Sequence, residues 1–273
     1  MLAFDFDGTI HWPEHESGVD ARLFEWIEFL RKKYGLVWGV CTGRSLPHLM
    51  EGLAEVRAPF GPDFVVARER EILLPGSVGR YEADKAWSKR MEKDHRRLFR
   101  RIRKDLAMVK AFVEGELGGE WVETPGDPAG VVLREAADME ALLEEVEKRC
   151  HRHAELSYER NGIYLRFSHA DYGKGPALME LARRWSLEPH QVVAAGDNFN
   201  DLSMLSPEVT KYPVCPGNAV GPVKKRVAVC GGHVGESPAS IGVVETFERI
   251  FLPAEAEEER ELEEEQEQQR RVS

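Results

Sequence analysis

The chain has 273 residues, 42% of them hydrophobic and 31% charged, with a formal net charge of −11. This composition is typical of a globular protein with a sizeable core. The acidic balance argues against a general nucleic-acid binder, which needs a dominant basic surface. No apolar run approaches the length of a membrane span, and no signal-peptide pattern opens the sequence. We therefore expect a cytoplasmic protein that binds neither nucleic acid nor membrane.

The four cysteines show no metal-ligand spacing. They lie far apart along the chain, at Cys41, Cys150, Cys215 and Cys230. Scattered cysteines without a secretory signal are expected to be reduced and to pack in the core.

The first third of the chain alternates predicted strands and helices. Apolar runs predict strands at 2–6, 36–41 and 63–70, with helices at 20–33 and 42–53 between them. In the first helix Leu23, Ile27 and Leu30 recur at helical spacing. Continuous apolar strands separated by helices indicate a parallel sheet covered on both faces.

The pattern changes near residue 83. A long helix follows, with a basic face and an apolar face made of Trp87, Met91, Leu98, Ile102, Leu106, Val109 and Val113. Two strands, a helix and two further strands are predicted after it, at 120–123, 130–135, 138–150, 155–159 and 163–168. An Asn-Gly turn at 161–162 separates the last two. The basic helix face is expected to be solvated rather than to bind a polyanion.

Strand and helix then alternate again. Predicted elements are a helix at 177–185, a strand at 191–196, a helix at 200–205, a strand at 211–215 and a helix at 242–251. We predict an α/β fold whose doubly wound, parallel-sheet core, residues 1–82 and 171–252, is interrupted by an inserted α+β cap domain, residues 83–170. Residues 253–273 form an acidic, low-complexity tail with little to bury, which we expect to be frayed or disordered.

Polar clusters follow several of the predicted core strands. They are DFDGT at 5–9, TGRS at 42–45, a lysine opening the helix near 174, and GDNFND at 196–201. Ligands of open parallel sheets bind beyond the carboxyl ends of the strands. Each cluster alone reads equally well as a turn or a helix cap, and a lone lysine is most often a surface residue.

Taken together, the clusters favour phosphoryl transfer. Asp5, Asp7 and Asp197 at one sheet edge would repel one another without a cation. A hard cation with few carboxylate ligands and room for phosphate describes Mg²⁺. Lys174 and Thr42 would supply the donors that face the oxygens of a transferring phosphoryl group.

These four motifs, in this order, resemble those of the haloacid dehalogenase superfamily. The inserted module resembles the large α/β cap of its Cof-like and sucrose-phosphate-phosphatase-like branch, and GNAV at 217–220 and the helix at 242–251 fit the same branch. The resemblance covers roughly residues 1–252. It implies that Asp5 is the nucleophile that forms an aspartyl-phosphate, and that Asp7 is the general acid and base.

The resemblance also implies the remaining site. The metal is expected to be Mg²⁺, held by Asp5, Asp197 and the backbone carbonyl of Asp7. Lys174 would offset the charge on Asp5 and the phosphate. The phosphoryl group and the substrate would be bound by Thr42, Gly43, Arg44 and Asn200. Thr9 and Asp201 would position the residues that contact the metal and the substrate.

The implied activity is that of a Mg²⁺-dependent phosphomonoester hydrolase acting on a small phosphorylated metabolite, most naturally a sugar phosphate. Asp7 argues against dehalogenation. A sugar phosphomutase and a non-catalytic phospho-ligand binder remain as alternatives.

Two features of the sequence lie outside the motifs. The stretch VVARERE departs from the branch, and we expect its arginines, Arg68 and Arg70, to face solvent. Within the cap, the residues that could contact substrate are Arg134, Arg160, Arg166 and His169.

Overall fold

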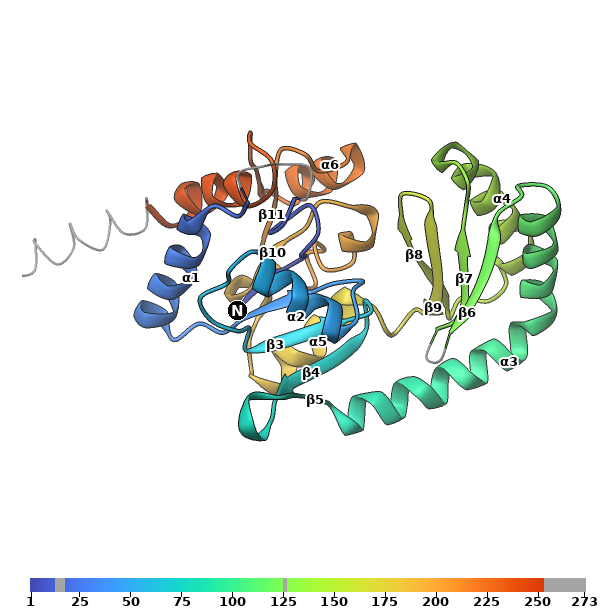
Figure 1. Cartoon of the computed structure of the whole chain (residues 1–273), viewed down its shortest axis with the longest axis horizontal. Helices are drawn as coiled ribbons and strands as arrows, with labels where there is room; N and C mark the ends of the chain where they lie inside the picture. The colour runs from blue at the N-terminus through green and yellow to red at the C-terminus, as the bar shows by residue number, and fades with distance from the viewer. Residues whose placement is uncertain (13–17, 125–126, 253–273) are drawn as a thin grey trace, which may run out of the picture.

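The first and last portions of the chain build one eight-stranded sheet (Figure 1). The computed structural model describes residues 1–12, 18–124 and 127–252. The strand order is β12-β11-β10-β1-β2-β3-β4-β5. The strands are β1 (Leu2–Phe4), β2 (Trp38–Cys41), β3 (Phe64–Ala67), β4 (Glu71–Pro75), β5 (Tyr81–Ala83), β10 (Val193–Ala195), β11 (Tyr212–Cys215) and β12 (His233–Val234). All pairs from β12 to β3 are parallel, and β4 and β5 add an antiparallel edge.

Helices cover both faces of this sheet. They are α1 (Ala21–Tyr34), α2 (Leu46–Glu55), α5 (Lys174–Arg184), α6 (Gly221–Val229) and a C-terminal helical segment at 239–252. Successive residues of a strand point to opposite faces, so Leu2 and Phe4 pack against α1 and the C-terminal segment, while Ala3 packs in the cluster that holds α5 and α6. The fold class predicted from the sequence, a doubly wound α/β core with a second domain, is confirmed.

The middle of the chain forms a separate four-stranded antiparallel sheet with order β6-β7-β9-β8. Its elements are α3 (Lys85–Gly115), β6 (Glu120–Thr124), β7 (Asp127–Val132), α4 (Met139–Cys150), β8 (Leu156–Asn161) and β9 (Tyr164–His169). The C-terminal half of α3 and all of α4 cover the sheet on the side away from the core (Figure 1). The other side of this cap sheet is therefore turned toward the core.

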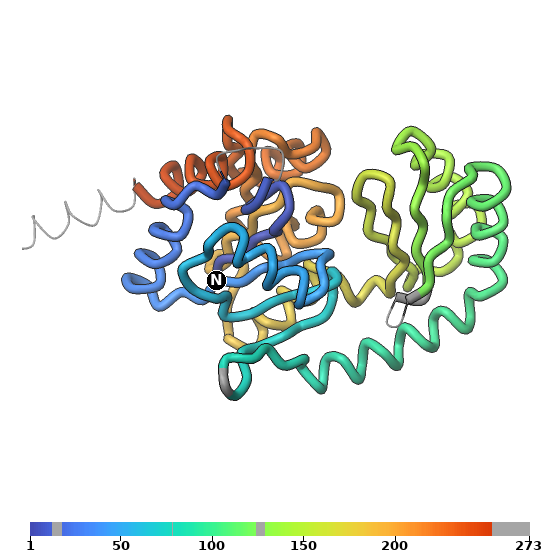
Figure 2. Tube along the Cα trace, in the orientation of Figure 1, coloured from blue at the N-terminus to red at the C-terminus, as the bar shows by residue number. Residues whose placement is uncertain are grey.

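A single helix belongs to both parts of the molecule. Trp87 and Met91, near the start of α3, pack in the core cluster, whereas Leu98 and the apolar residues after it pack in the cap. Figure 2 shows α3 running continuously beneath both parts. Asp84 begins this helix by accepting a hydrogen bond from Trp87 N, at 2.7 Å, as an N-cap residue does.

The structure corrects the predicted strand at 63–70. Strand β3 ends at Ala67, because Arg68 and Glu69 adopt positive φ angles of 47° and 69°, and the chain turns back into β4, which the sequence had not suggested. Charged residues rarely adopt this left-handed conformation, so the turn carries no glycine or asparagine signal. Arg70 is only 1% exposed, and the expectation that it faces solvent is wrong.

Two smaller expectations also change. The predicted helix at 200–205 is instead a single 3-10 turn, η4 (Phe199–Asp201), followed by further turns. Three other short 3-10 turns connect elements, namely η1 (Ser77–Gly79), η2 (Ala136–Asp138) and η3 (Pro189–Gln191). Three cysteines are buried as expected, and Cys230 is partly exposed. The acidic tail lies outside the described residues.

Candidate active site

Two neighbouring parallel strands bring the first and last acidic motifs together. Asp5 directly follows β1, and its backbone N–H donates to Ala195 O of the adjacent strand β10, at 2.8 Å. Asp197 lies two residues beyond the end of β10. Because β1 and β10 are parallel and paired, their carboxyl ends meet at the same sheet edge. Residues almost two hundred positions apart thus become neighbours.

Lys174 is buried among carboxylates. Its Nζ lies 2.6 Å from Asp5 Oδ1, 2.6 Å from Asp201 Oδ1 and 3.5 Å from Glu69 Oε2, and the residue has 0% exposure. Burial acts to lower the pKa of Lys174, but the negative charges of Asp201, Asp5 and Glu69 outweigh it and raise the pKa well above its usual value. The ammonium group therefore stays charged and compensates the acidic groups around it.

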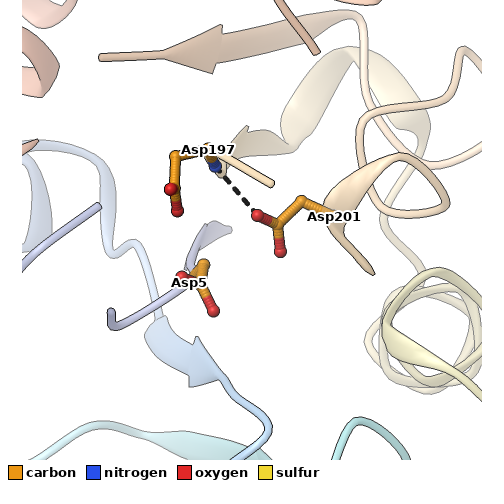
Figure 3. Close-up of side chains that lie close together, drawn as sticks. All are labelled: Asp5, Asp197 and Asp201. Carbon is orange, nitrogen blue, oxygen red and sulfur yellow. Dashed lines mark hydrogen bonds between the residues drawn. The ribbon is translucent and has the colours of Figure 1, made fainter. Parts of the chain in front are cut away.

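Figure 3 shows three carboxyl groups that lie close together. Asp5, Asp197 and Asp201 each offer an oxygen within 4.8 Å of the others. Asp201 Oδ2 accepts from the backbone N–H groups of Asp197, at 2.8 Å, and Asn198, at 2.9 Å, while its Oδ1 accepts from Lys174. Asp201 thus fixes the loop that carries Asp197. Burial and the charge of Asp201 raise the pKa of Asp197 to about 7.

Two small residues of the first motif fit closely around Asp197. Thr9 Oγ1 donates to Asp197 Oδ1 at 3.1 Å. Gly8 has a φ of +85°, and a Cβ added there would lie 2.3 Å from Asp197 Oδ2. Asn218, which the sequence reasoning did not single out, donates from Nδ2 to Gly8 O at 2.8 Å. Only glycine satisfies both the backbone angle and the space at position 8.

Asp7 is bound by an arginine of the second motif. Arg44 donates from Nε to Asp7 Oδ2 at 2.8 Å and from its terminal nitrogen to Asp7 Oδ1 at 2.6 Å. The arginine also stacks on Phe6, with its Cζ 4.7 Å from the ring centroid. This bidentate pair is a strong, geometrically specific contact. The sequence predicted that Asp7 lies beside the metal and that Arg44 binds the substrate. In the structure, the Arg44 and Asp7 side chains are hydrogen-bonded to each other.

The second motif also borders the site. Thr42 is 1% exposed, and its Oγ1 accepts from Arg44 N at 3.1 Å. A Cβ on Gly43 would lie 2.6 Å from Glu69 Oε1. The lack of a side chain at position 43 therefore lets the Glu69 carboxyl group approach this loop.

Glu69 is a candidate functional residue that the sequence reasoning missed. It is 5% exposed, contacts Lys174, and accepts a hydrogen bond from Asn200 Nδ2 at 3.1 Å. The sequence signal is the charged stretch ARERE, which by itself does not distinguish the glutamate from its charged neighbours. Only the left-handed turn at Arg68 and Glu69 directs the glutamate into the site.

A cavity of about 340 Å³ lies between the core and the cap. Its core side consists of Gly43, Glu69 and Asn200. Its cap side consists of Val122, Gly130, Val131, Val132, Glu159, Arg160, Asn161, Tyr164, Leu165 and Arg166. Of the four cap residues suggested by the sequence, Arg160 and Arg166 line this cavity, and Arg134 and His169 are not among its lining residues.

The hairpin of β8 and β9 touches the core directly. Asn198 Nδ2 donates to Asn161 Oδ1 at 3.0 Å, and the Arg160 guanidinium lies 4.3 Å from the centroid of the Phe199 ring. A cation–π contact of this kind adds about 0.5–2 kcal/mol. The loop that carries Asp197 is therefore also the loop on which the cap rests.

Comparisons with known proteins agree with the fold described above. Residues 124–244 match the family model of the haloacid dehalogenase-like hydrolases. The solved structure of sucrose-phosphatase from Synechocystis, in complex with sucrose and phosphate, superposes with a TM-score of 0.67 at 18% identity, over 89% of this chain and 94% of the other. A haloacid dehalogenase-like hydrolase from Bacillus subtilis gives 0.60 at 16% identity, over 91% and 90%.

A curated relative matches a shorter stretch. It is 5-amino-6-(5-phospho-D-ribitylamino)uracil phosphatase from Bacillus subtilis, 33% identical over 90 residues. These residues make up 33% of this chain and 30% of the relative's length.

The family model covers less than half of this chain, so the comparison establishes a likeness to the haloacid dehalogenase-like hydrolases over residues 124–244. The superposition on sucrose-phosphatase spans most of both chains, so the likeness of fold includes the cap. Among the residues described, no helix combines the length and hydropathy needed to cross a bilayer.

Proposed function

We propose that this protein is a Mg²⁺-dependent phosphomonoester hydrolase that acts through an aspartyl-phosphate on a small phosphorylated metabolite, a sugar phosphate. The observation that carries the proposal is Lys174, fully buried at 2.6 Å from both Asp5 and Asp201. Burying a charged lysine among carboxylates contributes little to stability on its own. In a site that binds a phosphate dianion, however, a buried positive charge would stabilise the bound phosphate.

The carboxylates beside Lys174 fit a magnesium ion. Asp201 is engaged through both oxygens, so Asp5 and Asp197 are the side chains that would hold the ion. The Asp7 backbone carbonyl is the third expected ligand. Two carboxylates and a carbonyl leave room for water and phosphate, as Mg²⁺ prefers. When bound, the ion would offset negative charge on the phosphoryl oxygens.

The chain's own residues would carry out two displacements. An Asp5 oxygen attacks phosphorus, the bond from phosphorus to the leaving oxygen breaks, and that oxygen takes a proton from Asp7. A water molecule then attacks phosphorus and gives a proton to Asp7, and the bond to Asp5 breaks. Inorganic phosphate leaves and both aspartates return to their starting forms. Lys174 would stabilise the charge on Asp5 and the phosphoryl group throughout.

In the structure, Asp7 is bound by Arg44. Two hydrogen bonds from the arginine hold the Asp7 carboxyl group, and the Asp7 side chain is 40% exposed. To protonate the leaving oxygen, Asp7 must first take up a proton from solvent and exchange at least one of these bonds for the substrate. Entry of substrate beneath the cap would favour that exchange.

The test is replacement of the nucleophile. Asp5→Asn keeps the size of the side chain but cannot form the acyl-phosphate, so phosphate release should fall by at least about 10⁴-fold, a loss typical of removing a covalent nucleophile. Phosphate release from a panel of sugar phosphates with Mg²⁺ would be measured. Asp171→Asn, at an exposed position, is the control and should retain activity.

Two further measurements complete this test: the dependence of turnover on metal, and the identity of the product. EDTA should stop turnover and added Mg²⁺ should restore it. Near-normal activity of Asp5→Asn, or turnover without metal, would refute the proposal. Isomerised sugar phosphate without free phosphate would instead identify a phosphomutase.

A further inference from the structure

The solvent-facing side of α3 carries a continuous row of basic side chains. Eight exposed residues form it, and we call them the basic stripe: Lys85, Lys89, Lys93, Arg96, Arg97, Arg100, Arg103 and Lys104. At 3.6 residues per turn, they fall within an arc of about 120° and along about 29 Å of the helix. The centre of this arc lies opposite the buried face of α3, which includes Leu98 and Ile102.

Acidic neighbours do not neutralise the stripe. Two other arginines of α3 do have acidic partners. Arg90 pairs with Glu180, and Arg101 pairs with Glu155. None of the eight stripe side chains forms an ion pair with any carboxyl group in the part of the chain that the structure describes. Glu92, at one edge of the stripe, is an exposed acidic residue on the same stretch of helix.

The members of the stripe also repel one another. Lys89 and Lys93 are four residues apart, as are Arg96 and Arg100. Like charges at this spacing destabilise a helix, because their side chains are neighbours on its surface. A bound anionic partner would offset this cost. Because exposed ion pairs are individually weak, such a partner must match many of the charges at once.

The chain itself contains a segment of matching charge. Residues 255–267 hold nine glutamates and one arginine, so their net charge of −8 equals the charge of the stripe with opposite sign. Thirteen residues span at most about 45 Å, enough to follow the stripe along its whole length. Because stripe and segment cancel, the rest of the chain carries the full −11, which would repel a nucleic acid or an anionic membrane.

The position of the last described residues favours a contact between two molecules. The Phe251 ring lies 6.0 Å from the Trp26 ring of α1, centroid to centroid. Figures 1 and 2 show α1 and the C-terminal helical segment on the side of the core away from the cap, whereas α3 runs from the core out beneath the cap. Glu255 can lie at most about 11 Å beyond Leu252. The acidic segment therefore starts far from the α3 of its own chain, whereas the α3 of another molecule is accessible along its whole stripe.

We propose that the basic stripe of α3 is a docking surface for residues 255–267 of a second copy of this chain. The sequence alone favoured a solvated basic face; the structure adds that the stripe is continuous, opposite the buried face and without acidic partners among the described residues. The stripe begins where α3 packs on the core and ends where it packs in the cap. The inference is independent of the proposed hydrolase function. The contact is electrostatic, so salt should weaken it.

The test is self-association of the full chain, measured by sedimentation equilibrium at about 20 mM and about 500 mM NaCl. The wild type should associate at low salt and sediment as a monomer at high salt. A stripe variant, Arg96→Glu/Arg100→Glu, and a segment variant, Glu258→Lys/Glu264→Lys, should each associate about tenfold more weakly than the wild type at low salt. Circular dichroism checks the fold, and Arg96→Gln/Arg100→Gln provides a milder change.

An equimolar mixture of the two variants is the decisive sample. It pairs the unaltered segment of the stripe variant with the unaltered stripe of the segment variant, so association between unlike molecules should return to within a few-fold of the wild-type strength. Lys211→Glu/Lys225→Glu is the matched control, since it reverses two exposed lysines outside the stripe. It should associate as the wild type does.

Three results would overturn the proposal. The first is a wild type that stays monomeric at low salt, or variants that associate as strongly as it does. The second is a mixture no stronger than either variant alone, which would mean that the segment does not dock on a second copy. The third is binding of a 20-base-pair DNA duplex that the stripe variant loses, without self-association of the wild type, which would make a nucleic acid the occupant of the stripe.

Discussion

The core and the cap meet across one cavity, but their facing surfaces are built differently. On the core side, Lys174 and the acidic groups around it are held by one another at distances as short as 2.6 Å, and they are buried. On the cap side, the residues that line the cavity are set by the register of an antiparallel sheet. A change in the core should therefore damage catalysis and stability together, whereas a change in the cap should alter the choice of substrate.

The largest effect is expected at Lys174. Lys174→Met leaves Asp5 and Asp201 buried without a compensating charge, which should lower the free energy of unfolding by about 3–5 kcal/mol. Turnover should fall by about 100- to 1,000-fold, since the group that stabilises the phosphoryl charge is lost. Urea unfolding and phosphate release would measure both.

The exposed Lys211 offers a matched control. Lys211→Met should change the free energy of unfolding by less than about 0.5 kcal/mol, as surface substitutions usually do. If Lys174→Met were as stable as this control, the core side of the site would not be the interlocked structure described above.

A somewhat smaller effect is expected at Gly8. Gly8→Ala introduces both a strained φ and a Cβ 2.3 Å from Asp197 Oδ2, so Asp197 must move. Displacement of a group in the site by about 1 Å costs roughly 100-fold in rate. The measurement is kcat with saturating Mg²⁺, together with the thermal unfolding temperature.

A substitution at Gly35 separates the effect of the strained φ from the effect of the clash with Asp197. It has a φ of +63° with open space around it, so Gly35→Ala bears the backbone strain alone, about 1–2 kcal/mol. Its kcat should be that of the wild type. Equal losses of activity in the two variants would mean that the fit between Gly8 and Asp197 is not needed for catalysis.

The smallest effect on catalysis is expected where the core joins α3. Burial acts to raise the pKa of Glu180, but hydrogen bonds from Arg183, Arg184 and Arg90 outweigh it and lower the pKa to about 2. A carboxyl group with a lowered pKa in the folded state stabilises the protein fully above its unfolded pKa of about 4.5, and this stabilisation is lost as the pH falls toward 2.

Glu180→Gln should remove that stabilisation, which is at most about 3 kcal/mol. The variant should be less stable than the wild type at pH 7, and the difference between them should shrink as the pH falls from 5 to 2. Urea unfolding at several pH values measures this, with Glu51→Gln on the exposed face of α2 as the control. A difference that does not vary with pH would show that Glu180 links α5 to α3 by shape rather than by charge.

Most of the core could be predicted from the sequence, because its signals are local. Apolar runs mark the strands, Asp5 and Asp197 stand where a parallel sheet brings strand ends together, and Lys174 opens the helix α5. The roles assigned to these residues remain predictions, although the structure brings these three together. The pairing of Asp7 with Arg44 was not predicted, since a bidentate contact between two motifs depends on side-chain geometry that the spacing of residues does not encode.

The cap shows the opposite case. Its helices and strands follow from periodicity, but which residues face the cavity depends on strand register, and a shift of one residue exchanges the two faces. Arg166 lines the cavity and Arg134 is not among its lining residues, although both are cap arginines that the sequence alone could not tell apart.

By itself, the sequence determined the order of elements, the burial of the sheet and the acidic chemistry at its edge, since these follow from periodicity and residue type over short stretches. Only the tertiary structure decided that Glu69 enters the site and that Gly130 of the cap sheet lines the same cavity. The first depends on a left-handed turn of charged residues, and the second on the pairing of four strands distant along the chain. Both are contacts between segments whose proximity is created by folding.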